Sequence, residues 1–416
     1  MSSQPPSSPS TARSSPSQSG AVAAKRPFSS LFEALDRNLT RKKHKSTGND
    51  PMAPFRKAAR WVGRGIDPFV RLSDAFRIGA AYAAAEDDAD DDDEPIGVPQ
   101  ELTDGLSKED IELYCKVYKR TKALVPNFGE ILEAFEDCPG TAMQLLDLMG
   151  SISSQCRSDD LGTLRTYGRD IVEACCLKPE EKVAWMDKKQ SYENKSTRGF
   201  NDNIFGRLLC PHKYSNDFEA DSDGFCQKVL EPDSGIVILA SDLPAFLYAG
   251  NYNPEAIDDG LLRGMLPVMM YKCIFRSPSS VTGVGQAKGR SCHAQLHGLV
   301  RVTPHTIAYA CMLTRFFCSS LVSWREKDGM FSFKQFYYYI VALFEMDPDS
   351  AWVAETLDWW DKQVFGSGPR RLASSMAEAQ NAADATSDFN ALIAQRNARR
   401  LTENSNDSRS STSSSP

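Results

Sequence analysis

Arginine residues recur at every fourth position in one short stretch of the chain. Arg56, Arg60 and Arg64 have this spacing, with aromatic and aliphatic residues between them. If the stretch is helical, the three guanidinium groups lie along one face, an arrangement that pairs with phosphate groups. The pattern also suits an anionic membrane surface, a groove on a partner protein, or packing against the rest of the chain. It predicts a polyanion-binding segment and leaves these alternatives open.

A second group of basic residues surrounds a glycine-containing segment between residues 277 and 302. Lys288, Arg290 and Arg301 lie within this segment, and Arg276 directly precedes it. The segment matches neither the Walker pattern nor G-x-G-x-x-G. Because the chain after the first 80 residues is acidic, a local excess of positive charge suggests a site for an anion. We expect these four residues to bind a polyanion, unless they form a surface loop whose bases pair with neighbouring acids.

Cysteine near histidine could supply zinc ligands. The chain has 11 Cys and 5 His. Neither Cys210 with His212 nor Cys292-His293 with His297 has the regular second ligand pair that a zinc site needs. The odd number of cysteines, scattered in apolar surroundings, indicates reduced thiols and an intracellular protein. The sequence predicts neither a metal nor a cofactor.

Catalytic motifs are absent from the sequence: it has no G-x-S-x-G elbow, no H-E-x-x-H helix and no protein kinase signature. A non-enzymatic protein is therefore the preferred interpretation. The alternative is an enzyme of unknown class whose site lies near Cys210, Arg263, His297 and Arg301.

Two clusters of basic residues near the N-terminus resemble a two-part nuclear import signal. They lie in an arm rich in serine and proline, which has too little apolar surface to form a core and would leave them accessible to a receptor. We expect binding to a nuclear import receptor and localisation in the nucleus, with the cytoplasm as the alternative. The clusters consist of Lys25, Arg26, Arg41, Lys42, Lys43 and Lys45.

Composition divides the chain into five parts. They are a disordered Ser/Pro-rich basic arm (1–54), a basic amphipathic helical segment (55–85), an acidic linker (86–100), a helical globular body (101–366) and a mobile Ala/Ser-rich tail (367–416). The net charge of -7 excludes a uniformly basic protein. No apolar run is long enough for a transmembrane segment.

The body is predicted to be mainly α, an irregular helical globular unit with long loops, flanked by disordered tails. Apolar spacing predicts helices at about 141–150, 161–176, 180–188 and along one face from Phe333 to Phe344. Ser107 with Asp110 resembles a capping box. Thr303-Pro304 and Asp347-Pro348 are expected to begin helices ending near 320 and 365, and helical spacing over 258–275 is expected to break or kink at Pro267. Residues 191–234 are expected to be an irregular connection, and 236–239 a short strand.

A series of short motifs resembles an uncharacterised domain family found in many copies in mushroom-forming basidiomycete fungi. The resemblance covers about residues 105–366 and implies a fungal origin. The family has no established activity, so it supplies no catalytic residues. The motifs include Leu208-Leu209-Cys210-Pro211, Phe246-Leu247-Tyr248, Gly260-Leu261-Leu262-Arg263, His297-Gly298, Val302-Thr303-Pro304, Arg315-Phe316 and Trp359-Trp360.

These observations favour a non-enzymatic nuclear module that binds nucleic acid or a chromatin-associated partner. The enzyme described above and a protein-only interaction scaffold are the two alternatives. A deep polar pocket would favour the enzyme, and a continuous basic surface without a pocket would favour the binding module.

Overall fold

A computed structural model gives the fold of the chain and describes residues 29–39, 50–88, 98–134, 139–231, 233, 236–282 and 292–366. The predicted import clusters, from Lys25 to Arg26 and from Arg41 to Lys45, lie outside the described residues, as do Lys288 and Arg290. The described part is mainly α, as predicted. Within it, no helix combines the length and apolar character needed to cross a bilayer.

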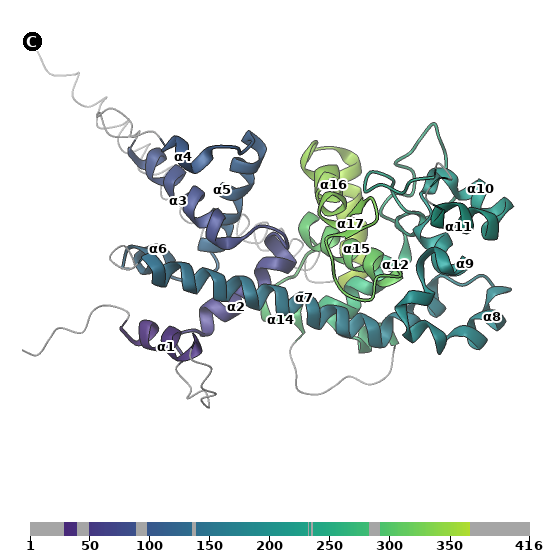
Figure 1. The fold of residues 1–416 in the computed structure, drawn as a ribbon, viewed down its shortest axis with the longest axis horizontal. Coiled ribbons are helices and arrows are strands. Elements are labelled where there is room, and N and C mark those ends of the chain that lie inside the picture. Colours follow the sequence, from purple (N-terminus) through teal and green to yellow (C-terminus); the bar gives the residue numbers. More distant parts are fainter. Residues whose placement is uncertain are drawn as a thin grey trace, which may run out of the picture.

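One long helix, α7 (Pro139–Cys175), runs through both halves of the molecule (Figure 1). Its 37 residues replace the two separate helices predicted at 141–150 and 161–176. The polar residues between those two segments continue the helix because both halves of the molecule contact it. Cys156 and Asp160, for example, are buried at mid-helix.

The N-terminal lobe consists of the helices before α7 together with the first part of α7. Its core contains the aromatic rings of Phe55, Phe76 and Phe128, with centroids 5.2–5.3 Å apart for the two pairs that Phe128 makes. The predicted capping box of Ser107 and Asp110 is confirmed at the start of α5. In chain order the helices are α1 (Ser29–Leu39), α2 (Ala53–Trp61), the π-helix η1 (Val62–Ile66), α3 (Leu72–Asp88), α4 (Gln100–Thr103), α5 (Lys108–Lys122) and α6 (Phe128–Glu133).

Two boundaries in this lobe differ from those that composition indicates. Helix α1 lies inside the arm for which disorder is predicted, because Leu31, Ala34 and Leu35 have helical spacing and are buried against the lobe. Helices α5 and α6 and the first part of α7 pack with α2 and α3 in one core instead of joining the body predicted to begin at 101. Tyr118 shows why: its ring packs edge-on against Phe76 at 5.1 Å.

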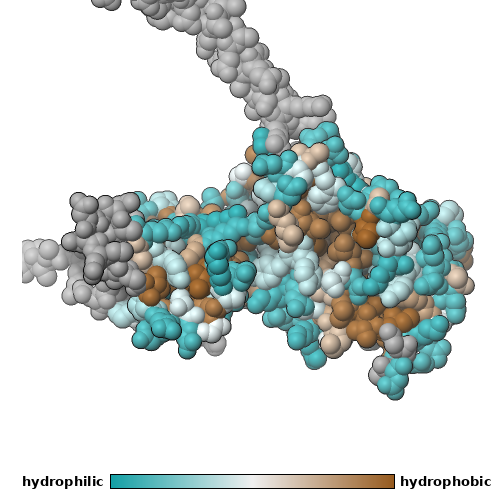
Figure 2. All heavy atoms as spheres, turned by 90° about the horizontal axis from the view of Figure 1, so that it is seen from above, coloured by the Kyte–Doolittle hydropathy of each residue, from teal (hydrophilic) through white to brown (hydrophobic). Residues whose placement is uncertain are grey.

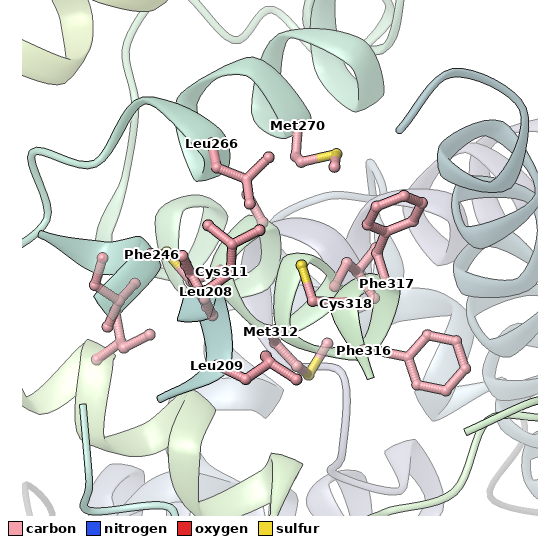
Figure 3. Close-up of a cluster of buried hydrophobic side chains, with 14 of the residues drawn as sticks. Leu208, Leu209, Phe246, Leu266, Met270, Cys311, Met312, Phe316, Phe317 and Cys318 are labelled. Carbon is pink, nitrogen blue, oxygen red and sulfur yellow. The ribbon is translucent and has the colours of Figure 1, made fainter. Parts of the chain in front are cut away.

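The C-terminal lobe is built around α15, in which every side chain from His305 to Cys318 is buried. Figure 3 shows side chains of α9 and α12 meeting those of α15 in this core. The elements after α7 are α8 (Glu181–Lys188), η2 (Ser191–Glu193), η3 (Lys195–Thr197), η4 (Gly199–Asn201), α9 (Asn203–Leu209), η5 (His212–Tyr214), α10 (Ser215–Ala220), α11 (Ser222–Leu230), η6 (Ala245–Leu247), α12 (Met265–Tyr271), the π-helix η7 (Lys272–Arg276), α13 (Ser279–Thr282), α14 (His293–Leu296), α15 (Pro304–Cys318), β1 (Lys327–Asp328), β2 (Phe331–Ser332), α16 (Phe333–Glu345) and α17 (Ala351–Phe365).

Cationic side chains satisfy the buried C-terminal end of α15. Lys195 Nζ donates to the Phe316 carbonyl at 2.5 Å, and Arg198 Nη1 donates to the Phe317 carbonyl at 2.9 Å. Helix C-terminal carbonyls lack partners within the helix and carry the negative end of its dipole, so hydrogen-bond donors and positive charge stabilise them. Burial, together with the charge of Arg198, lowers the pKa of Lys195 to about 7.

Several local predictions for this lobe are confirmed. Thr303 caps α15 and Pro304 occupies its first turn. The face predicted for α16 is buried at Phe333, Phe336 and Phe344. Helix α8 lies where 180–188 is predicted to be helical.

Other local predictions are wrong, each for a physical reason. Residues 191–234 contain three short α-helices, two of them begun by aspartates, Asp202 and Asp221, whose side chains accept hydrogen bonds from backbone N–H groups in the first turn. Residues 236–239 pair with no strand of the described chain; the only ladder there joins β1 and β2. Pro267 does not break α12, since it lies in the first turn, where proline is tolerated. Ser350 caps α17 in place of Asp347.

The surface seen in Figure 2 is largely hydrophilic, with hydrophobic areas between. These areas are larger over the C-terminal lobe, at the right of the view, than over the N-terminal lobe. Exposed large apolar residues of the C-terminal lobe include Val183, Val322 and Met330.

Candidate polyanion-binding site at the junction of the lobes

Two π-helices, η1 and η7, pack against α7 where the lobes meet. Helix η1 continues α2 after Trp61, and η7 continues α12 after Tyr271. Single-turn π-helices are rare and are frequent at functional sites. The short helix α14 packs against η7 and brings two histidines to the same region.

The centre of the junction is a buried ion pair between Arg64 of η1 and Asp160 of α7. Nε of Arg64 lies 2.8 Å from Oδ2 of Asp160, and Nη2 lies 2.8 Å from Oδ1. The Tyr309 hydroxyl of α15 donates to Oδ2 at 2.8 Å. Burial lowers the pKa of the Arg64 guanidinium, but the hydrogen bonds and charge of Asp160 outweigh this and raise the pKa overall. Burial and the negative charge of Asp160 keep Tyr309 a neutral donor by raising its pKa.

This ion pair corrects the prediction for Arg64. Its side chain is 2% exposed, so the guanidinium cannot reach a phosphate group in solution. Its function is to join α7 and η1, with Tyr309 adding α15. Asp160 was not predicted from the sequence, although its position gave a signal. It lies four residues from both Cys156 and Leu164, on the same buried face of α7.

An aromatic stack lies beside the ion pair. The rings of Trp61 and His297 are 4.9 Å apart and inclined by 24°. Trp61 also meets Phe275 of η7 edge-on at 6.4 Å. Burial, together with the positive charges of Arg64, His293, Lys57 and Arg60, lowers the pKa of His297 to about 4. His297 is therefore neutral at physiological pH.

The exposed part of the junction is basic. Lys57 and Arg60 of α2 are exposed, and neither has an ion-pair partner among the described residues. Arg56 is half-buried and pairs with Asp50. The sequence of α2 contains no acidic residue. We define the junction site as Lys57, Arg60, Trp61, His293 and His297.

Of the second basic group, Arg276, Lys288, Arg290 and Arg301, the structure describes Arg276 and Arg301. Arg276 is half-buried and donates to the Val364 carbonyl at the end of α17 at 3.0 Å, so it caps that helix. Arg301 is exposed.

The residues proposed for an enzymatic site have different neighbours. Cys210 is buried, its thiol donates to the Pro211 carbonyl at 3.4 Å, and burial raises its pKa to about 12. Arg263 lies over the ring of Trp359 at 5.1 Å, and His297 stacks on Trp61. With the thiol of Cys210 protonated and enclosed, the arrangement does not provide an activated nucleophile.

Two adjacent cavities of about 250 and 260 Å³ lie in the N-terminal lobe, between α3 and α7. The first is polar, with Arg71, Asp147 and Ser153 in its wall. The second is apolar, with Phe76 and Met143 in its wall. Neither is lined by any residue of the proposed enzymatic site or of the junction site.

A family model, that of a family of unknown function (DUF6698), matches residues 151–365. The match covers just over half of the chain. It begins at residue 151, later than the start at 105 that the sequence motifs suggest, and ends at 365, next to the expected 366. No curated protein and no solved structure matches the chain.

Proposed function

The chain belongs to the family of unknown function DUF6698, and we propose that it is a non-enzymatic nuclear module that binds nucleic acid through the junction site and the basic arm. The observation that carries the proposal is the exposed, acid-free basic face of α2 beside the stack of Trp61 and His297. On the sequence motifs alone, we also propose that the chain is of fungal origin.

Lys57 and Arg60 supply the electrostatic part of this binding. Phosphate contacts by lysine and arginine provide most of the affinity of non-specific nucleic-acid binding. Because neither side chain has an ion-pair partner among the described residues, binding does not require an internal pair to be broken. Since the chain as a whole has a charge of -7, attraction to a polyanion must come from local basic surfaces such as this one.

The aromatic part of the site suits bases that are not paired in a duplex. Trp61 and His297 are both half-buried, so each has part of its surface accessible beside the two basic residues. Single-stranded nucleic acid is commonly bound by a basic groove with aromatic side chains on which bases stack. We therefore propose that the junction site prefers single strands to duplexes.

The basic arm would supply nuclear import and a second electrostatic attachment. Its two clusters, Lys25-Arg26 and Arg41 to Lys45, provide the charge for both. In this proposal the arm increases affinity for any polyanion, and the junction site accounts for the preference for single strands.

The test compares two double variants of the full chain, both of which remove two positive charges. Lys57→Ala with Arg60→Ala changes the junction site, and Lys228→Ala with Lys334→Ala changes two exposed lysines of the C-terminal lobe. Fluorescence anisotropy with a labelled single-stranded oligonucleotide gives affinity as a function of salt. We expect the first variant to bind several-fold more weakly, with a salt slope reduced by about two phosphate contacts, and the second to match the native chain.

Equal affinity and salt slope in both variants would overturn the assignment of the junction site. If the native chain retained proteins, but no nucleic acid, in a pull-down from nuclear extract with and without nuclease, the protein-only scaffold would replace the proposal.

A further inference from the structure

Two adjacent cysteines end the long helix α7. The Sγ atoms of Cys175 and Cys176 lie 3.4 Å apart, within hydrogen-bond distance for thiols. Both residues are half-buried, with the Cys176 thiol more enclosed than that of Cys175. The Cys175 thiol also contacts the Ile171 carbonyl at 3.1 Å, which fixes its orientation along the last turn.

A guanidinium group lies next to this pair. Arg207 of α9 donates through Nη2 to the Cys176 carbonyl at 3.0 Å and to the Glu181 carboxylate at 2.7 Å. Its Nε is buried and has no hydrogen-bond partner among the described residues. The positive charge of Arg207 favours a thiolate at this position, whereas the negative end of the α7 dipole opposes one.

One hydrogen bond joins the two thiols. The hydrogen bond from Cys176 lowers the pKa of Cys175, and the same hydrogen bond, with burial, raises the pKa of Cys176 well above its ordinary value. Cys175 is therefore the sulfur that ionises first, with the Cys176 thiol as its donor. A thiolate is the form of cysteine that attacks electrophiles and binds soft metals.

A direct disulfide between these residues would be strained. Consecutive Cα atoms are about 3.8 Å apart across a trans peptide bond, below the usual range of roughly 4.4–6.8 Å for disulfides. A single additional atom between the two sulfurs enlarges the ring and removes this constraint. The geometry thus favours a ligand atom that bonds to both sulfurs.

We propose that Cys175 and Cys176 form a dithiol site that binds a trivalent arsenical, with one arsenic atom bonded to both sulfurs. The reaction with an organoarsenic oxide forms two As–S bonds and breaks the As=O bond. The two thiol protons leave with the oxygen as one water molecule. Arsenic stays trivalent throughout, so no oxidant or reductant is required.

The other described cysteines do not provide such a site. No other two of their sulfurs lie within hydrogen-bond distance of each other in the described part of the chain. Burial raises the pKa of Cys273 and Cys318 to about 12. Cys115 is half-buried on α5, and its pKa is raised as well. A monothiol at these positions could form only one bond to arsenic, which excess competing thiol reverses easily.

The test uses phenylarsine oxide with the reduced full-length chain, and intact mass spectrometry reads the product. We expect one phenylarsenic group to be retained, with loss of one water, in the presence of excess monothiol and to be removed by a dithiol. Cys175→Ser and Cys176→Ser should each abolish this retention. Cys115→Ser, which removes a half-buried thiol in the other lobe, should leave it unchanged.

A second measurement needs no variant. Alkylation by iodoacetamide followed by peptide mapping should show Cys175 and Cys176 protected after treatment with phenylarsine oxide. Retention that persists in both serine variants, or alkylation of this peptide that phenylarsine oxide does not change, would overturn the proposal.

Discussion

The two lobes are both helical but are built on different patterns. In the C-terminal lobe, α15 is buried on all sides, including its polar residues His305, Thr306, Thr314 and Arg315. In the N-terminal lobe, α2 has one buried face, with Phe55, Ala58 and Ala59, and one exposed basic face. The comparison teaches that a helix buried all round serves the internal packing, whereas a helix with one exposed face leaves charge available for a partner.

A buried ion pair between Arg64 and Asp160 joins the lobes, and breaking it should give the largest loss of stability. Asp160→Asn leaves the Arg64 guanidinium buried without a counterion, which costs about 3–5 kcal/mol in buried pairs. Urea unfolding should show this loss as a lower midpoint. Asp159→Asn changes an exposed neighbour on the same helix, so we expect less than about 0.5 kcal/mol. Similar costs for the two variants would show that the pair does not join the lobes.

Substitutions at two glycines of α7 test how tightly the C-terminal lobe packs on this helix. A Cβ at Gly168 would lie 2.4 Å from the buried ring of Phe317, so Gly168→Ala should destabilise the protein by about 1–3 kcal/mol. A Cβ at Gly162 meets nothing within 4 Å, so Gly162→Ala should stabilise it by about 0.5–1 kcal/mol through helix propensity. Thermal unfolding of both variants gives the two signs. A stabilised Gly168→Ala variant would mean that Phe317 can move aside.

The smallest expected effect concerns the ion pair at the edge of the interface between the lobes. Lys116 of α5 lies 2.6 Å from Glu345 of α16. The hydrogen bonds from His305 and Lys116 lower the pKa of Glu345 to about 2, against an ordinary value of 4.5. Because the native state holds the carboxylate ionised, its contribution to stability is complete above about pH 4.5 and is lost as the pH falls toward 2.

Glu345→Gln should therefore reduce stability at pH 6 and have progressively less effect below pH 4.5. Urea unfolding at several pH values measures this convergence. A difference from the native chain that stays constant with pH would exclude Glu345 as the group that titrates.

Sequence patterns predicted the parts of the fold that depend on neighbouring residues. The cap at Thr303 and the buried face of α16 follow from residues within four positions of each other. The continuity of α7 and the burial of Arg64 could not be predicted in this way. Arg64 and Asp160 are 96 positions apart, and only the folded arrangement shows that they pair.

The same limit applies to the junction site. Arg60 lies exposed on a helix, as its spacing suggests, although Arg64 has the same spacing and is enclosed. Lys57 was not among the residues predicted to bind a polyanion. The aromatic residue His297 of the same site comes from a segment more than 200 residues later in the chain. Spacing shows which residues share a helix face, but not which face another element covers.

The start of the family match inside α7 has a consequence for how the region can exist alone. A fragment beginning at residue 151 would start in the middle of a 37-residue helix, with Asp160 and Tyr309 separated from the arginine that they hold. It would also expose the side of α7 that α2 and η1 cover. The unit of sequence similarity is thus smaller than the unit that folds, and any chain carrying only the matched region must protect this helix with a segment of its own or with a second protein.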